Sequence, residues 1–140
     1  MFSHLGIDFG TKNIGLALGD KQSGVVVVHE TIRNDEKSLA TIVRLIQIEN
    51  IECIVLGRPI DLNGRDFPVT RQMDAWKEKM QTLIDLPIIV VDERFTTSEV
   101  RRSLKGSREH KQTLRDAQSA VLILQAYFDR QGFTCDSESL

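Results

Sequence analysis

The stretch "HLGIDFGTKNIGLALGD", residues 4–20, carries the pattern that decides the fold. Two short apolar segments, 4–9 and 13–19, are separated by glycine and asparagine residues, which is typical of a β-hairpin. An aspartate, Asp8, lies near the end of the first segment. Because an ionised carboxylate in an apolar strand is costly unless cations or hydrogen-bond donors meet it, Asp8 indicates a site for a metal or a phosphate.

The rest of the chain alternates between strand and helix patterns. A third strand is expected in "GVVVVHETI" (24–32), and parallel strands in "ECIVLG" (52–57) and "PIIVVDE" (87–93). Apolar residues recur at helical spacing in 35–50, 69–84 and 113–131, and a short helix is expected over 96–106. This order predicts an α/β fold, with a mixed sheet of three antiparallel strands and then two parallel strands, and helices on both faces.

Two of the expected helices carry specific boundary and core predictions. Asn34 and Asp35 are good cap residues for the first, whose buried stripe is expected to include Ile42, Ile46 and the more terminal Ile48. In the second, Trp76 lies on the stripe with Met73 and Met80, and we expect these side chains to belong to the core rather than to a surface that stacks on bases.

Length and composition indicate one domain, which we assign to residues 1–134, with a disordered tail at 135–140. The chain has 140 residues, of which 41% are hydrophobic and 27% charged, as in ordinary folded proteins. Neither a membrane helix nor a secretory signal is recognisable, so we expect a cytoplasmic protein without membrane contact. Cys53 lies in an apolar run and reads as a small buried hydrophobe, so neither a disulfide framework nor a zinc site is supported.

A net charge of −2 disfavours coating of nucleic acid by bulk electrostatics, but one segment is strongly basic. The stretch "RRSLKGSREHKQTLR", residues 101–115, contains a single acid, Glu109, beside six basic residues: Arg101, Arg102, Lys105, Arg108, Lys111 and Arg115. On charge alone, a solvated face and a phosphate-binding surface are equally good interpretations. His110, in the same segment, is a candidate for proton transfer or phosphate binding, against a structural role.

Three acids are placed where an α/β protein builds its site. Asp8 lies on the first strand, Glu93 follows the last one, and Asp116 lies one turn before Ala120 in the final helix. Clustered carboxylates favour Mg²⁺ or Mn²⁺, and two such ions about 4 Å apart would activate a water for phosphodiester hydrolysis. Taken singly, the same acids also fit bland roles: a hairpin side chain, an ion-pair partner of Arg94, and a helix cap.

Four segments together resemble the YqgF/RuvX family of RNase H-like proteins. They are "GIDFGTKNIGLALGD", "IVLGRPIDLNG", "VVDERFTTSEV" and "RDAQSAVLILQAYFD", and the resemblance runs through almost the whole chain. This family is assigned to Holliday junction resolution and to pre-16S rRNA processing. The resemblance implies an RNase H-like fold and a metal-dependent nuclease whose catalytic, metal-holding triad is Asp8, Glu93 and Asp116. The chain departs from the family pattern at Arg115, where an apolar residue is expected, and at Ser119, where alanine is expected.

A further set of basic residues is expected to bind substrate phosphate. Arg58, in a glycine-rich loop that also matches the family, is one of them, with Lys12 and Arg94. The basic stretch adds Arg101, Arg102, Lys105, Arg108 and Lys111. Arg58 and Arg94 also fit structural roles, pinning a loop or pairing with an acid.

The predicted function is a pre-16S rRNA nuclease, a metal-dependent endonuclease acting on structured nucleic acid as a monomer or homodimer. A Holliday junction resolvase acting on branched DNA and a non-catalytic nucleic-acid adaptor are the alternatives. An ATPase of the actin and sugar-kinase type is a further rival, since its opening strand and turn are similar to "GIDFGTKNIG". The short chain disfavours that rival, because those proteins close two such domains around the nucleotide.

Overall fold

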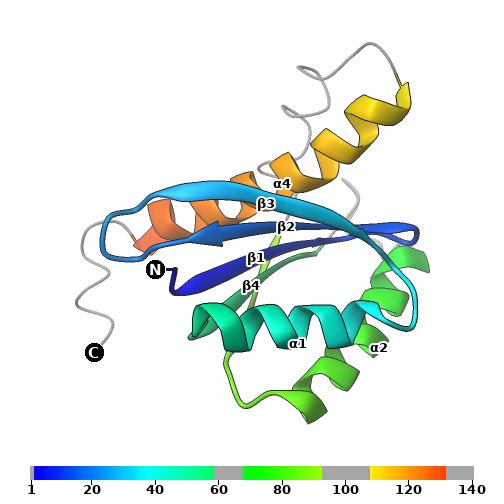
Figure 1. The fold of residues 1–140 in the computed structure, drawn as a ribbon, viewed down its shortest axis with the longest axis horizontal. Helices are drawn as coiled ribbons and strands as arrows, with labels where there is room; N and C mark the ends of the chain where they lie inside the picture. Colours follow the sequence, from blue (N-terminus) through cyan, green and yellow to red (C-terminus); the bar gives the residue numbers. More distant parts are fainter. Residues whose placement is uncertain (1, 59–67, 93–107, 132–140) are drawn as a thin grey trace.

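The computed structural model describes residues 2–58, 68–92 and 108–131, with the side chains of 2–57, 71–91 and 117–130. Five strands form one sheet in the order β3-β2-β1-β4-β5 (Figure 1). The strands are β1 (His4–Phe9), β2 (Asn13–Gly19), β3 (Val26–Arg33), β4 (Cys53–Arg58) and β5 (Ile88–Asp92). The first three pair antiparallel, whereas β4 pairs parallel with β1 and β5 parallel with β4. The predicted mixed sheet is therefore confirmed.

Helices cover both faces of this sheet, as predicted. Helices α1 (Ser38–Glu49) and α2 (Pro68–Leu83) lie on one face, and α4 (Arg108–Gln131) lies on the other (Figure 1). Within the described ranges, no helix is long and apolar enough to cross a membrane.

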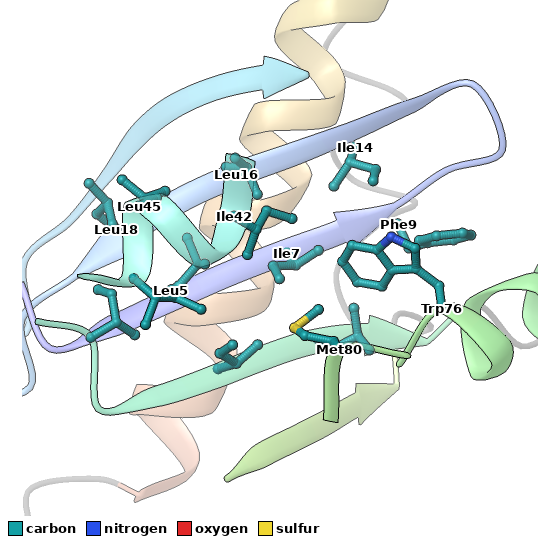
Figure 2. Packing of buried hydrophobic residues seen from close by; sticks show 14 of the residues in the cluster. Leu5, Ile7, Phe9, Ile14, Leu16, Leu18, Ile42, Leu45, Trp76 and Met80 are labelled. Carbon is teal, nitrogen blue, oxygen red and sulfur yellow. The ribbon is translucent and has the colours of Figure 1, made fainter. Parts of the chain in front are cut away.

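The larger part of the core lies between the sheet and helices α1 and α2. Ile7 and Phe9 of β1 point toward this side, where they meet Ile42 of α1 and the aromatic ring of Trp76 (Figure 2). The rings of Phe9 and Trp76 are 5.2 Å apart between centroids, and Trp76 Nε1 donates a hydrogen bond of 3.3 Å to Ser38 Oγ. Trp76 therefore joins α2 to the start of α1, and its predicted place in the core is confirmed.

The side of the sheet that faces α4 has a thinner apolar layer. Ala17, Val55 and Val91 of the strands pack there against Ala120 and Leu124 of the helix. Ser119 of α4 is also buried. The serine that replaces the alanine of the family pattern therefore lies in a buried position, as an alanine there would. Small side chains on both partners allow the helix backbone to approach the strands closely.

Two predicted helix starts are wrong, for different physical reasons. Helix α1 begins at Ser38, and its N-cap position, Lys37, makes no side-chain cap hydrogen bond. The Asp35 carboxylate accepts a hydrogen bond of 2.9 Å from the backbone N–H of Lys37, so it forms a turn before the helix rather than a cap. Ile48 is 65% exposed and lies outside the buried stripe, whereas Ile42 is fully buried.

The last helix starts earlier than its apolar pattern indicates. It begins at Arg108, so Asp116 lies in its third turn and is not a helix cap. His110 accordingly lies in the first turn of α4. The short helix expected over 96–106 and the tail 135–140 lie outside the described residues.

Candidate active site

Asp8, at the carboxyl end of β1, has a glycine opposite it on each of the two neighbouring strands. Its Cα partners are Gly15 on β2 and Gly57 on β4, so the residues directly opposite the half-buried Asp8 carry no side chain on either neighbouring strand. The same row of Cα partners continues to Val91 on β5, which belongs to the apolar layer under α4. Because side chains alternate along a strand, Asp8 shares with Gly6 the face of β1 that α4 covers.

Helix α4 runs antiparallel to β1 along this face. At the start of the strand, the His4 ring lies 5.6 Å from that of Tyr127 and 5.1 Å from that of Phe128, between centroids. Two residues further along β1, a Cβ built on Gly6 would lie only 2.9 Å from the carbonyl oxygen of Ala120. The glycine at position 6 is therefore what permits the helix backbone to contact the strand.

The same pairing of strand and helix, continued by two residues along β1 and by one turn back along α4, leads to two of the predicted acids. Two strand residues advance about 6.6 Å, and one helical turn of four residues advances about 6 Å. Moving on from Gly6 reaches Asp8, and moving back one turn from Ala120 reaches position 116 on the same face of α4. Asp8 and the backbone of Asp116 thus lie at the same end of the contact between β1 and α4.

The third acid, Glu93, lies outside the described residues, immediately after β5 ends at Asp92. Among the residues that are described, no group of three or more His, Cys, Asp or Glu side chains is arranged to hold a metal ion. Asp8 is the one member of the predicted triad whose side chain falls within that set. Its carboxylate oxygens are hard ligands of the kind that Mg²⁺ and Mn²⁺ prefer.

The predicted phosphate-binding residues fall into three groups. Lys12 is exposed in the turn between β1 and β2, and Arg58 is the last residue of β4, next to Gly57. Arg108 and Lys111 lie in the first turns of α4, which extend away from the sheet (Figure 1). The remaining members lie outside the described residues: Arg94, Arg101, Arg102 and Lys105.

Asn34 is a residue near the site whose role the sequence pattern does not reveal, because an asparagine at this position also suits a helix cap. Its side-chain Nδ2 donates a hydrogen bond of 2.7 Å to the carbonyl oxygen of Gly10, and its backbone N–H donates one of 2.8 Å to the carbonyl of Lys12. The connection from β3 to α1 is thereby tied to the turn that follows Asp8 in the chain.

The other end of β1 is packed in a way that suits structure rather than catalysis. His4 is buried, its Nδ1 lies 2.8 Å from Ser3 Oγ, and burial, with a smaller contribution from Lys21, lowers its pKa below the usual 6.5. Cys53, the Cα partner of His4 on β4, is also buried, and desolvation raises the pKa of its thiol to about 11. The interpretation of Cys53 as a small buried hydrophobe is confirmed.

Two solved structures share the fold of this chain. Thermus thermophilus RuvC in complex with a Holliday junction substrate is 15% identical with a TM-score of 0.55, over 92% of this chain and 96% of that one. The fowlpox virus Holliday junction resolvase is 12% identical with a TM-score of 0.52, over 91% of this chain and 98% of that one. The domain has the RNase H-like α/β fold of RuvC-type resolvases, as predicted.

Sequence relatives narrow the class to one family. The family model described as "RuvX: Holliday junction resolvase" matches residues 3–130, and the chain belongs to this family of nucleases. A Dictyoglomus turgidum relative is 38% identical over 130 residues, which cover 89% of this chain and 92% of that protein. A Bacillus subtilis relative is 33% identical over 132 residues, covering 89% and 96%. Both relatives carry the name "Putative pre-16S rRNA nuclease".

Proposed function

We propose that this chain is a metal-dependent endonuclease that hydrolyses phosphodiester bonds in precursor 16S rRNA, in the cytoplasm. The observation that carries the proposal is the end-to-end similarity to relatives named for that activity, which extends over 92% of the Dictyoglomus protein. The placement of Asp8 beside two glycines, under the turn of α4 that contains Asp116, supports a hydrolytic site at the same place.

The carboxylates of Asp8, Asp116 and Glu93 would hold Mg²⁺ or Mn²⁺, two ions in all. When bound, such ions supply the charge that activates a water and stabilises the leaving oxygen of a phosphodiester. Asp8 contributes from the central strand, where pairing on both sides fixes its backbone. Since Val91 faces α4, regular alternation beyond β5 would bring Glu93 to the same side of the sheet.

Basic residues around this end of the sheet would bind the substrate backbone. Positions 108, 111 and 115 are three and four residues apart, so they share one face of α4, distinct from the face of Ala117 and Ala120 that packs on the sheet. With Lys12 and Arg58 near Asp8, this face forms a path for a phosphate chain, to which Arg94, Arg101, Arg102 and Lys105 would add. Such contacts position a nucleic acid without reading its sequence.

A resolvase acting on branched DNA is the second candidate. It is favoured by the family description and by the shared fold with RuvC. Paired cuts in a four-way junction call for a two-fold dimer, whereas trimming of RNA works equally well in a monomer. A non-catalytic adaptor is less well supported, because a surface that only binds phosphate gains nothing from three clustered carboxylates.

Cleavage by purified protein tests these proposals directly. We expect the wild type, with Mg²⁺ or Mn²⁺, to cut labelled precursor 16S RNA faster than a four-way DNA junction, and EDTA to abolish cutting. Asp8→Asn should reduce the cleavage rate at least 100-fold while RNA binding persists. The matched control is Asp20→Asn, since Asp20 is a turn carboxylate at the opposite end of β2 that bonds Ser23 Oγ.

Equal cleavage by the wild type and Asp8→Asn would show that the activity does not belong to this site. Faster cutting of the junction, by a protein that is dimeric in solution, would select the resolvase instead. Intact binding with no cleavage of either substrate would select the adaptor.

A further inference from the structure

The turn between β1 and β2 is held from outside the hairpin. It consists of Gly10, Thr11 and Lys12, and both of its ends are tied to Asn34 by the bonds from Nδ2 to the Gly10 carbonyl and from the backbone N–H to the Lys12 carbonyl. The backbone bond continues the pairing of β2 with β3, whose last pair is Asn13 with Arg33, by one residue. In Figure 1 the turn and the chain that leads from β3 into α1 lie together at one end of the sheet.

The side-chain bond depends on a group that an amide supplies and a carboxylate lacks. The Gly10 carbonyl is an acceptor, so its partner must donate, and the Nδ2 of an asparagine provides that N–H. Asn34 is half-buried, whereas Thr11 and Lys12 are exposed, so the bond fixes a solvent-facing turn from its protected side. A Cβ at position 10 would lie 2.5 Å from the Asn13 carbonyl oxygen, so the turn closes tightly around Thr11 and Lys12.

Neighbouring residues show that this bond serves the turn and not the start of the helix. The N-cap of α1 is Lys37, and Asp35 satisfies the backbone N–H of Lys37 by itself. Asn34 instead directs its amide across to the hairpin, away from α1. The chain that follows Asn34 is anchored as well, because α1 packs into the core through Ile42.

We propose that Asn34 is a positioning residue for nucleic-acid binding, which holds the turn so that the Lys12 ammonium meets a substrate phosphate beside Asp8. The inference rests on the proposed function, because Lys12 is expected to contact phosphate only if this end of the sheet binds nucleic acid. A lysine on an untethered turn would lose more conformational freedom on binding. Asn34 thus contributes to affinity without touching the substrate.

The test measures RNA binding by Asp8→Asn protein in EDTA, so that no cleavage is needed. In this background, Lys12→Ala, Asn34→Ala and the double variant are titrated with labelled precursor RNA at several salt concentrations. We expect Lys12→Ala to weaken binding about tenfold and to reduce the slope of log K against log salt by about one. Asn34→Ala should weaken binding about fivefold and reduce the slope as well, although it removes no charge.

The double variant separates positioning from a merely structural role. If Asn34 acts through Lys12, adding Asn34→Ala to Lys12→Ala has little further effect, and the total stays near tenfold rather than fiftyfold. Thr82→Ala is the matched control, because it removes a side-chain bond of 2.7 Å to the Lys79 carbonyl at the exposed end of α2. This control should alter neither the affinity nor the salt slope.

An unchanged salt slope for Asn34→Ala, or losses that multiply in the double variant, would overturn the inference. Wild-type protein that binds RNA but cuts nothing would refute the proposed nuclease, while the binding cycle would still decide the role of Asn34. Absence of RNA binding by the Asp8→Asn protein and by the wild type would refute both.

Discussion

Gly6→Ala should push α4 away from the sheet. The new Cβ would lie 2.9 Å from the Ala120 carbonyl oxygen and 3.1 Å from Leu124 Cβ, whereas ordinary contact begins at 3.4 Å. Relief of the closer contact needs a shift of about 0.5 Å, which is 3.4 Å minus 2.9 Å. Because the atom in the way belongs to the helix backbone, no side-chain rotation can supply that shift.

The expected loss of stability is about 1 kcal/mol, within a range of about 0–2.5 kcal/mol. Overpacking of a well-packed site costs about 1–3 kcal/mol, and replacing a strand glycine by alanine returns about 0.5–1 kcal/mol by restricting the unfolded chain. Gly19→Ala is the matched control, since its Cβ would meet Leu124 Cδ2 at 2.8 Å and Phe128 Cε2 at 2.9 Å. Those are the ends of side chains that can rotate, so the control should lose less than about 0.5 kcal/mol.

Urea unfolding, followed through the fluorescence of the buried Trp76, measures both variants, and cleavage of precursor RNA measures the effect on the site. Asp116 lies one turn from Ala120, so α4 would carry it away from Asp8. A misplacement of 1 Å costs about 100-fold in rate, so 0.5 Å should lower kcat about tenfold in Gly6→Ala. Gly6→Ala that is as stable as Gly19→Ala, or as active as the wild type, would refute the close packing of α4 on β1.

Three further predictions concern buried side chains. Burial, with a smaller contribution from a nearby lysine, lowers the pKa of His4 below 6.5. As pH drops below 6.5, the unfolded state therefore takes up a proton before the folded state does, and the free energy of unfolding should fall. The urea midpoints at pH 7.5 and 5.5 should accordingly differ more in the wild type than in His4→Phe. Desolvation raises the pKa of the Cys53 thiol to about 11, which lowers the fraction of reactive thiolate in the folded protein. In a Cys135→Ser chain at pH 8, iodoacetamide should therefore modify Cys53 at least about 100-fold more slowly in the folded protein than in urea. Trp76→Phe loses the bond to Ser38 and some core volume, so circular dichroism in urea should show a loss of about 1–2 kcal/mol, and an unchanged midpoint would contradict that packing.

Most of the sheet and the packed helices could be predicted because their apolar periodicity is strong. Helix starts could not, since each depends on polar residues that serve two purposes. Asn34 and Asp35 suit a cap and a turn equally well, and the turn is formed. The first turn of α4 contains Arg108, Glu109 and Lys111, which favour helix by propensity but carry no apolar stripe to reveal it.

For the candidate site, the sequence leads to an expectation about place and not to the detail. The rule that ligands bind beyond the carboxyl ends of parallel strands, with the spacing of Asp116 from Ala120, predicts that the three acids share one end of the sheet. Strand register decides that Gly15 and Gly57 flank Asp8, and register follows from pairing between strands that are distant in sequence. Contact between Asn34 and the hairpin turn likewise depends on how β3 lies beside β2.

The docking of α4 on β1 also sets an order on folding during synthesis. Asp8 is translated a hundred residues before Arg108, where the helix that covers its face of the sheet begins. Until then Ala17, Val55 and Val91 have no apolar partner from α4, and Asp8 has no helix opposite it. A nascent chain that stalls before α4 therefore exposes this apolar face of the sheet, so we expect a truncated product to aggregate or to be degraded by proteases.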